Sequence, residues 1–326
     1  MEAALYDPER GFYPNREKTA DFYTAPELHP AFGATLADAL AALLRRVRED
    51  RPGEPAALVE AGCGDGTLAA QVVSRLRAAH PDAVRGLRVI LVERTARDRG
   101  EAARRVAPLG LPVEACAGVE ALPEFCGVLY SNELVDALPA HLLAKSDGRV
   151  REVLVDGTRE VLAEPSSAEL AAAADAARDL PEGGRRAVCL EAPRWLAAAA
   201  ARLSDGFLVT IDYGKRYAPD APIEPRGYRA HRAAADLLAS PGTQDLTVPA
   251  DFEALIAAGA DCGLALESYG TLARFLIDAG IERWFAAEVG ETVASHKNRA
   301  QLKTLLHPEG MGEAFKVLVQ RKTISR

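Results

Sequence analysis

The stretch Glu60-Ala61-Gly62-Cys63-Gly64-Asp65-Gly66-Thr67 decides the fold of this chain of 326 residues. An apolar run from Ala56 to Glu60 leads into it, and Leu68 to Leu76 after it carries apolar side chains at helical spacing. Strand, glycine loop and helix therefore follow one another. Glycines at the end of a strand let the backbone approach a ligand, and the amides that begin a helix engage its polar groups. The stretch predicts a site for a nucleotide-like ligand.

The spacing of the glycines narrows the class of ligand. Thr67 stands where the fingerprint Gly-x-Gly-x-x-Gly has its third glycine, which disfavours NAD, and no Gly-Lys-Ser/Thr ending marks a P-loop. The other glycines, Gly62, Gly64 and Gly66, remain candidate cofactor residues, and so does Thr67.

Two acids make the site specific. Glu60 places a carboxylate where the ammonium group of a cofactor would lie, and Glu93 ends the second strand, where an acid accepts hydrogen bonds from ribose hydroxyls. S-adenosyl-L-methionine (SAM) carries an ammonium group, a sulfonium and a ribose, so the pair predicts SAM as cofactor and S-adenosyl-L-homocysteine as product. The competing interpretation is a tight turn with two surface acids, and it is weaker because both acids fall at strand ends.

Strands and helices alternate along the chain, which predicts an α/β fold with a parallel sheet. Helical spacing marks residues 30–48 and 94–106, and strand patterns mark 87–93, 111–115, 127–131, 207–213, 264–269 and 314–321. We expect one enlarged domain, residues 1–326. Its expected parts are a loop and helix cover (1–50), the cofactor-binding half (56–139), two insertions (140–205 and 215–250) and the rest of the core sheet (206–214 and 251–326).

Composition excludes several function classes. The 39 Lys and Arg against 47 Asp and Glu give a net charge of −8, which disfavours nucleic acid as a partner. No apolar run approaches the ~20 residues of a membrane span, and Met1 to Arg10 lacks a basic segment followed by an apolar one, so we expect no membrane contact and a cytoplasmic location. The five scattered cysteines lack the spacing of a zinc site, and no metal is expected.

Further motifs over most of the chain carry a family resemblance. They are Tyr6-Asp7-Pro8-Glu9-Arg10-Gly11-Phe12-Tyr13, Asp21-Phe22-Tyr23-Thr24-Ala25-Pro26-Glu27, Ser131-Asn132-Glu133-Leu134-Val135-Asp136-Ala137-Leu138-Pro139, Ile211-Asp212-Tyr213-Gly214, Tyr228-Arg229-Ala230-His231-Arg232 and Gln244-Asp245-Leu246-Thr247. With the glycine loop they resemble the MidA-like methyltransferases. The resemblance implies a Rossmann-like class I SAM-dependent methyltransferase, with a mostly parallel seven-stranded sheet, helices on both faces and insertions. It also implies methylation of an arginine on a protein or peptide, in one branch a respiratory complex I subunit.

Asn132, Glu133 and Asp136 follow the fourth strand, at the edge where a methyl acceptor would meet the cofactor. Methyl transfer is an in-line displacement that needs the reacting atoms held within ~3 to 3.5 Å, and carboxylates orient a guanidinium through paired hydrogen bonds. A protonated guanidinium is a poor nucleophile, so Glu133 is the candidate that polarises it or accepts its proton. The alternative is that Asn132 caps a following helix whose first turn holds Glu133 and Asp136; for Asp136 the two are even.

The amino-terminal segment could lie over the cofactor and exclude water. For Thr24 and Glu27 a role in the site is favoured, and for Phe12 and Tyr13 simple packing. Three functions stay open: methyl transfer to a protein arginine, methyl transfer to a small metabolite, and a SAM-binding assembly factor without catalysis. Formation of a homodimer is left open as well.

Overall fold

The computed structural model describes residues 1–15, 25–229, 232–287 and 292–323. The chain forms two compact units. The core unit comprises Thr24–Leu134, Trp195–Gly214 and Ile256–Arg326, and the second unit comprises Met1–Tyr23, Val135–Arg194 and Lys215–Leu255. The predicted insertions, 140–205 and 215–250, fall largely in the second unit, and the single enlarged domain stays a prediction.

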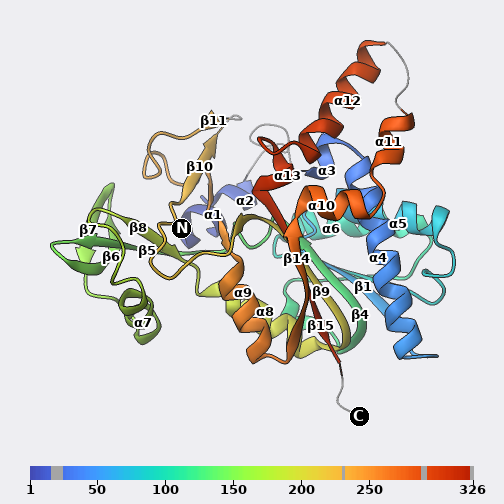
Figure 1. Ribbon diagram of the computed structural model, residues 1–326, viewed down its shortest axis with the longest axis horizontal. Coiled ribbons are helices and arrows are strands. Elements are labelled where there is room, and N and C mark those ends of the chain that lie inside the picture. Colours follow the sequence, from blue (N-terminus) through green and yellow to red (C-terminus); the bar gives the residue numbers. More distant parts are fainter. Residues whose placement is uncertain (16–24, 230–231, 288–291, 324–326) are drawn as a thin grey trace. The chain divides into compact units, whose positions relative to one another are not determined.

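A mostly parallel sheet forms the centre of the core unit (Figure 1). Its seven strands follow the order β14-β15-β9-β4-β1-β2-β3. Neighbouring strands from β9 to β3 are parallel, and β15 is antiparallel to both β9 and β14. The strands are β1 (Ala56–Ala61), β2 (Arg88–Val92), β3 (Val113–Cys116), β4 (Phe125–Asn132), β9 (Leu203–Lys215), β14 (Leu264–Thr271) and β15 (Phe315–Lys322). The predicted mostly parallel seven-stranded sheet is confirmed.

The strand order decides where a ligand can bind. The chain moves outward from β1 to β2 and β3 and then returns to the other side of β1 as β4. In open α/β sheets the ligand lies beyond the carboxyl ends of the strands at such a reversal, because the connections diverge there and leave a crevice. The ends of β1 and β4 are therefore the expected site.

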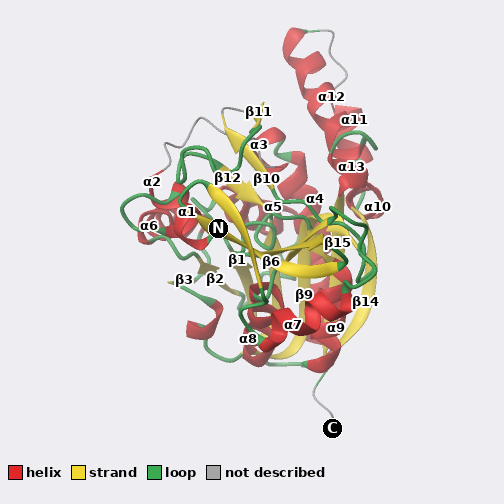
Figure 2. Cartoon of the chain, turned by 90° about the vertical axis from the view of Figure 1, so that its left-hand side faces the viewer, coloured by secondary structure: helices red, strands yellow, loops and turns green. Residues whose placement is uncertain are grey.

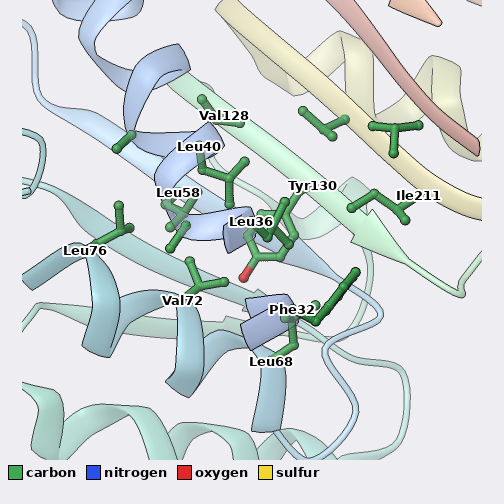
Figure 3. Close-up of a cluster of buried hydrophobic side chains, with 14 of the residues drawn as sticks. Phe32, Leu36, Leu40, Leu58, Leu68, Val72, Leu76, Val128, Tyr130 and Ile211 are labelled. Atoms are coloured by element: carbon green, nitrogen blue, oxygen red, sulfur yellow. The ribbon is translucent and has the colours of Figure 1, made fainter. Parts of the chain in front are cut away.

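Helices cover both faces of the sheet. On one face, α4 (Ala31–Asp50) and α5 (Thr67–Ala79) pack over Leu58 of β1 and Val128 of β4, with Phe32, Leu36 and Leu40 of α4 fully buried (Figure 3). α4 matches the helix predicted from the spacing of these residues. On the other face, α9 (Phe252–Asp261) approaches β15 closely, since a Cβ on Gly259 would meet Nε2 of Gln320. The remaining helices of the core unit are α3 (Ala25–Leu28), α6 (Ala96–Val106), η1 (Ala107–Leu109), η2 (Val119–Ala121), α10 (Leu272–Asp278), α11 (Glu282–Ala287), α12 (Val293–Leu306) and α13 (Met311–Ala314).

The second unit contains two small antiparallel sheets with the orders β7-β6-β5-β8 and β11-β10-β12. The predicted hairpin turn at Ser146-Asp147-Gly148 is confirmed, with positive φ at Asp147 (55°) and Gly148 (73°), the backbone that a two-residue hairpin turn requires. The elements are α1 (Glu2–Tyr6), α2 (Phe12–Asn15), β5 (His141–Ser146), β6 (Arg149–Asp156), β7 (Arg159–Ala163), α7 (Ala168–Ala176), β8 (Arg185–Val188), β10 (Arg226–Arg229), β11 (Arg232–Ala233), β12 (Asp245–Thr247) and β13 (Ala250–Asp251). α8 (Glu191–Arg202) runs from the second unit into the core unit.

Three expectations need correction. Residues 1–30 were expected to be a structured loop, yet their described parts contain the short helices α1, α2 and α3. The loop-rich stretch 215–250 holds the sheet β11-β10-β12. The helices α10 to α13 had no counterpart in the predicted pattern, and α12 extends away from the sheet (Figures 1 and 2). Helices of four to seven residues carry too few turns for a periodic pattern, so packing stabilises them rather than local sequence.

Candidate functional site

The glycine loop joins β1 to α5 and is tied to the neighbouring strand. The amides of Gly62 and Cys63 donate to the carbonyl oxygen of Val92, at 2.8 and 3.1 Å. Gly66 precedes α5 with a φ of 80°, and a Cβ there would lie 2.6 Å from Cα of Ala102 in α6. Gly66 is therefore a glycine because α6 passes directly over it.

Gly64 differs from Gly66 in what surrounds it. Its φ is 52°, and a Cβ built on it would meet no atom of the described residues within 4 Å. The backbone at Gly64 therefore borders open space, as a backbone that contacts a ligand must. Its amide donates to Oε2 of Glu93 at 3.0 Å, which brings two predicted cofactor residues together.

Glu93 follows β2 and is held by three backbone contacts. Its Oε1 accepts from the amide of Thr95 at 2.8 Å, and its own amide donates to the carbonyl oxygen of Cys116 at 3.0 Å. Its carboxylate is fixed beside the glycine loop at the carboxyl end of a strand. This is the position from which an acid binds the two hydroxyls of a ribose.

Glu60 lies at the end of β1 and is 3% exposed. Its Oε2 accepts a hydrogen bond from the hydroxyl of Tyr130 in β4 at 2.8 Å. Burial raises the pKa of Glu60 to about 8; the hydrogen bond from Tyr130 opposes the rise, and the negative charges of Asp65 and Glu93 add to it. A buried acid with negative neighbours is a place where a bound cation would be stabilised.

Thr67 is held within the loop. Its hydroxyl donates to Oδ1 of Asp65 at 2.7 Å and accepts from Nη1 of Arg105 at 2.5 Å, and Arg105 also pairs with Asp65 at 2.8 Å. These contacts fix the turn into α5. A direct cofactor contact of Thr67 stays a prediction.

Glu133 follows β4 with an unusual backbone. Its φ is 52°, a left-handed conformation that costs a residue with a Cβ about 1 kcal/mol or more and that is common at functional sites. Its amide donates to the carbonyl oxygen of Ile211 at 3.0 Å, and its Oε1 accepts from Nδ2 of Asn132 at 3.0 Å and from the amide of Ala25 at 3.2 Å. Strand pairing and α3 thus hold the carboxylate of Glu133 in one orientation.

The alternative role for Asn132, as the cap of a following helix, is wrong. The residues after β4 form turns rather than a helix, because the chain bends at Glu133 and again at Asp136 and Ala137. Oδ1 of Asn132 is buried and has no hydrogen-bond partner among the residues that the structure describes. Asn132 therefore orients Glu133 through its Nδ2.

Asp136 belongs to the second unit. It is 7% exposed, and its carbonyl oxygen accepts from the amide of Val248 at 2.9 Å. Its charge acts on Tyr13, whose hydroxyl donates to Oδ1 of Asp245 at 3.0 Å; burial first, then the charges of Asp245 and Asp136, raise the pKa of Tyr13. A role for Asp136 in the acceptor site stays a prediction, and Tyr13 packs against Tyr6 and Phe12.

The two candidates of the amino-terminal cover stand differently. Thr24 lies outside the described residues. Glu27 is exposed in the first turn of α3, and α3 is fixed to the core by Nε2 of Gln71, which donates to the carbonyl oxygen of Pro26 at 3.0 Å. A cofactor contact of Glu27 stays a prediction.

Sequence reasoning missed two contributors to this site. Tyr130 stands in an apolar strand and was taken as core, and the amide of Ala25 carries no sequence signal of its own. Both contact residues far along the chain, Glu60 and Glu133 respectively. Alternation along β4 could have placed Tyr130 on the face of Glu60 only once β1 and β4 were known to be neighbours.

The described residues fit SAM. Open space borders the backbone of Gly64, a buried acid ends β1, and a second acid ends β2 beside the same loop. These suit, respectively, the approach of a ligand, an ammonium group and a ribose. Among the described helices, none combines the length and apolar character that crossing a membrane requires.

Comparisons with known proteins point to the same cofactor. Residues 35–270 match the family model of S-adenosyl-L-methionine-dependent methyltransferases. The mitochondrial protein arginine methyltransferase NDUFAF7 homolog of Drosophila melanogaster is 27% identical, over 98% of this chain and 79% of that protein. NDUFAF7 of Danio rerio is 28% identical, over 97% and 80%. A crystal structure from Burkholderia thailandensis, bound to S-adenosyl-homocysteine, is 29% identical with a TM-score of 0.81 and covers 100% of this chain and 87% of that one.

Proposed function

Because this chain belongs to the family of S-adenosyl-L-methionine-dependent methyltransferases, we propose that it methylates an arginine side chain of a protein. The relatives from Drosophila melanogaster and Danio rerio are named protein arginine methyltransferases, which supports this acceptor over others. When bound, SAM supplies the methyl group from its sulfonium. The residues of this chain must hold the acceptor and manage its proton.

The orientation of Glu133 carries the proposal. Two donors, Asn132 Nδ2 and the amide of Ala25, share Oε1 of Glu133 and so fix the plane of the carboxylate. A fixed carboxylate pairs with a planar guanidinium through two parallel hydrogen bonds, which gives both affinity and direction. Glu133 follows β4, the strand beside β1, whose end carries the glycine loop. This arrangement suits an acceptor that is brought to the cofactor edge of the sheet.

Glu133 also has a role in the chemistry. A guanidinium has a reference pKa above ~12 and is a poor nucleophile while protonated. The carboxylate of Glu133 polarises the guanidinium through its hydrogen bonds and accepts the proton released on transfer. The positive φ of Glu133 supports a functional reason for this residue, since a glycine or an asparagine would occupy that backbone at lower cost.

Labelled SAM tests the acceptor. The purified protein is incubated with methyl-labelled SAM and an extract of its own cells, and the labelled species is located and digested. Methylated arginine in a protein is the expected result. Label confined to small molecules would establish the metabolite alternative instead, and no label despite measurable binding of S-adenosyl-homocysteine would establish an assembly factor without catalysis.

Glu133→Gln tests the residue. The variant keeps an oxygen for the contacts with Asn132 and Ala25, so it should bind S-adenosyl-homocysteine as the wild type does. Loss of the proton acceptor should lower methyl transfer at least ~100-fold. The matched control is Glu124→Gln, an exposed acid just before the amino end of the same strand, which should keep full activity. Equal turnover of both variants would remove Glu133 from the mechanism.

Location and assembly stay predictions. The cytoplasmic location rests on the sequence alone, and the relatives above are named mitochondrial. The homodimer rests on no contact in the structure.

A further inference from the structure

Tyr130 and Glu60 form a buried pair across the two central strands. They are directly opposite in the parallel pairing of β1 and β4, are 1% and 3% exposed, and join through the 2.8 Å hydrogen bond. Figure 3 shows Tyr130 within the cluster formed by α4, α5 and the sheet. The ring has the apolar contacts of a core residue, while its hydroxyl reaches the acid that begins the glycine loop.

The surroundings of Glu60 lack positive charge. The titratable groups that act on it are Tyr130 of β4, Cys63 and Asp65 of the loop, and Glu93 after β2. Tyr130 is the one hydrogen-bond donor to its side chain among the described residues, and no described Lys, Arg or His pairs with it. The α4 residues of the same cluster, such as Phe32 and Leu36, are apolar. Glu60 is thus an acid prepared for a cation that this part of the chain does not itself supply.

We propose that Tyr130 is a positioning residue that holds the carboxyl group of Glu60 for the ammonium group of the cofactor, and that cofactor binding releases the proton of Glu60 to solvent. The inference rests on SAM as cofactor and is independent of the methyl acceptor. Failure to find a methylated arginine would therefore leave it standing.

The direction of the pH dependence follows from the pair. Without cofactor, burial raises the pKa of Glu60 to about 8, so the carboxyl group is largely protonated at neutral pH. A bound ammonium group favours the carboxylate and lowers that pKa. Affinity for the cofactor therefore rises as the pH rises toward the pKa of the free protein, and binding below that pH releases a proton.

Tyr130→Phe separates positioning from packing. The variant keeps the ring and removes the donor that favours the carboxylate, so the pKa of Glu60 in the free protein rises further. With a rise of about one unit, the Kd for S-adenosyl-homocysteine should be about tenfold weaker than that of the wild type near pH 7. The ratio of the two Kd values should fall toward one well above pH 9, where Glu60 is ionised in both proteins. The amino group of the ligand titrates equally with both proteins and cancels in the ratio.

Calorimetry with S-adenosyl-homocysteine over a pH series measures that ratio. Titrations in two buffers of different ionisation enthalpy count the proton released near pH 7. Tyr217→Phe is the control, a half-buried tyrosine of the second unit whose loss of a hydroxyl should leave Kd unchanged at every pH. A Tyr130→Phe ratio of one throughout, or a ratio that does not change with pH, would overturn the proposal, the second because it would indicate packing alone. A wild type that releases no proton near pH 7 would also overturn it.

Discussion

Replacing Gly64 or Gly66 with alanine should harm the protein in two different ways. Both glycines have positive φ, 52° and 80°, which costs an alanine about 1 to 2 kcal/mol. At Gly66 the new Cβ would also lie 2.6 Å from Cα of Ala102, so α6 must move. Such overpacking costs about 1 to 3 kcal/mol more. Gly66→Ala should therefore lower the free energy of unfolding by about 2 to 5 kcal/mol.

At Gly64 the methyl group would enter open space, so the backbone strain of about 1 to 2 kcal/mol is the whole cost to stability. The methyl group would, however, project from the loop where we place the cofactor. Gly64→Ala should lose most of the affinity for S-adenosyl-homocysteine, at least ~10-fold, because a bound ligand has to shift away from the loop. The assays are urea unfolding for stability and calorimetry for affinity.

Gly53 provides a matched control. It has a φ of 87° and no described atom within 4 Å of a Cβ, and it lies before β1 rather than after it. Gly53→Ala should lose as much stability as Gly64→Ala and keep full affinity. Wild-type affinity in Gly64→Ala would refute the placement of the cofactor, and equal stabilities of Gly66→Ala and Gly53→Ala would refute the close approach of α6.

Two further predictions concern stability. The pKa of Glu60 in the folded protein, about 8, exceeds its value of about 4.5 in the unfolded chain, so Glu60 contributes stability below pH 4.5 that is lost as the pH rises to about 8. Without cofactor, the free energy of unfolding should fall by up to about 4 kcal/mol over that window in the wild type relative to Glu60→Gln, measured by urea unfolding at several pH values; parallel curves would contradict it. Asp38 of α4 is nearly buried and binds nitrogens from three other segments, those of Arg75, His80 and Arg283. Asp38→Asn should cost about 3 kcal/mol, far more than Asp82→Asn in an exposed ion pair with Arg45, and equal thermal shifts would show that the network is weak.

Much of the fold followed from local patterns. The apolar runs of β1, β2, β4 and β9 and the spacing along α4 record which faces are buried, and burial is a property that a short window of sequence can show. The helices α10 to α13 had no such signal, because they are stabilised by packing of residues such as Leu272 and Leu302 into the core cluster. The turn after β4 was open to two interpretations, since Asn-Glu after a strand fits both a helix cap and a bend.

The candidate site divides in the same way. Glu60, Gly64 and Glu93 could be named from the sequence because the chemistry of the cofactor requires those residue types at strand ends. The contact between Gly64 and Glu93 was within reach, since parallel neighbours end at one edge of the sheet. The contacts of Glu133 with Ala25 and of Glu60 with Tyr130 were not, because they join residues 108 and 70 positions apart.

The sequence by itself therefore determined the kind of cofactor and the loop that receives it. A glycine loop between an acid-ended strand and a helix is a continuous segment, and its chemistry can be read without knowing its neighbours. Only the tertiary structure decided how its acid is held, because the pairing of β1 with β4 brings Tyr130 to Glu60 across 70 residues. That pairing depends on the order of strands in the whole sheet, which no local pattern records.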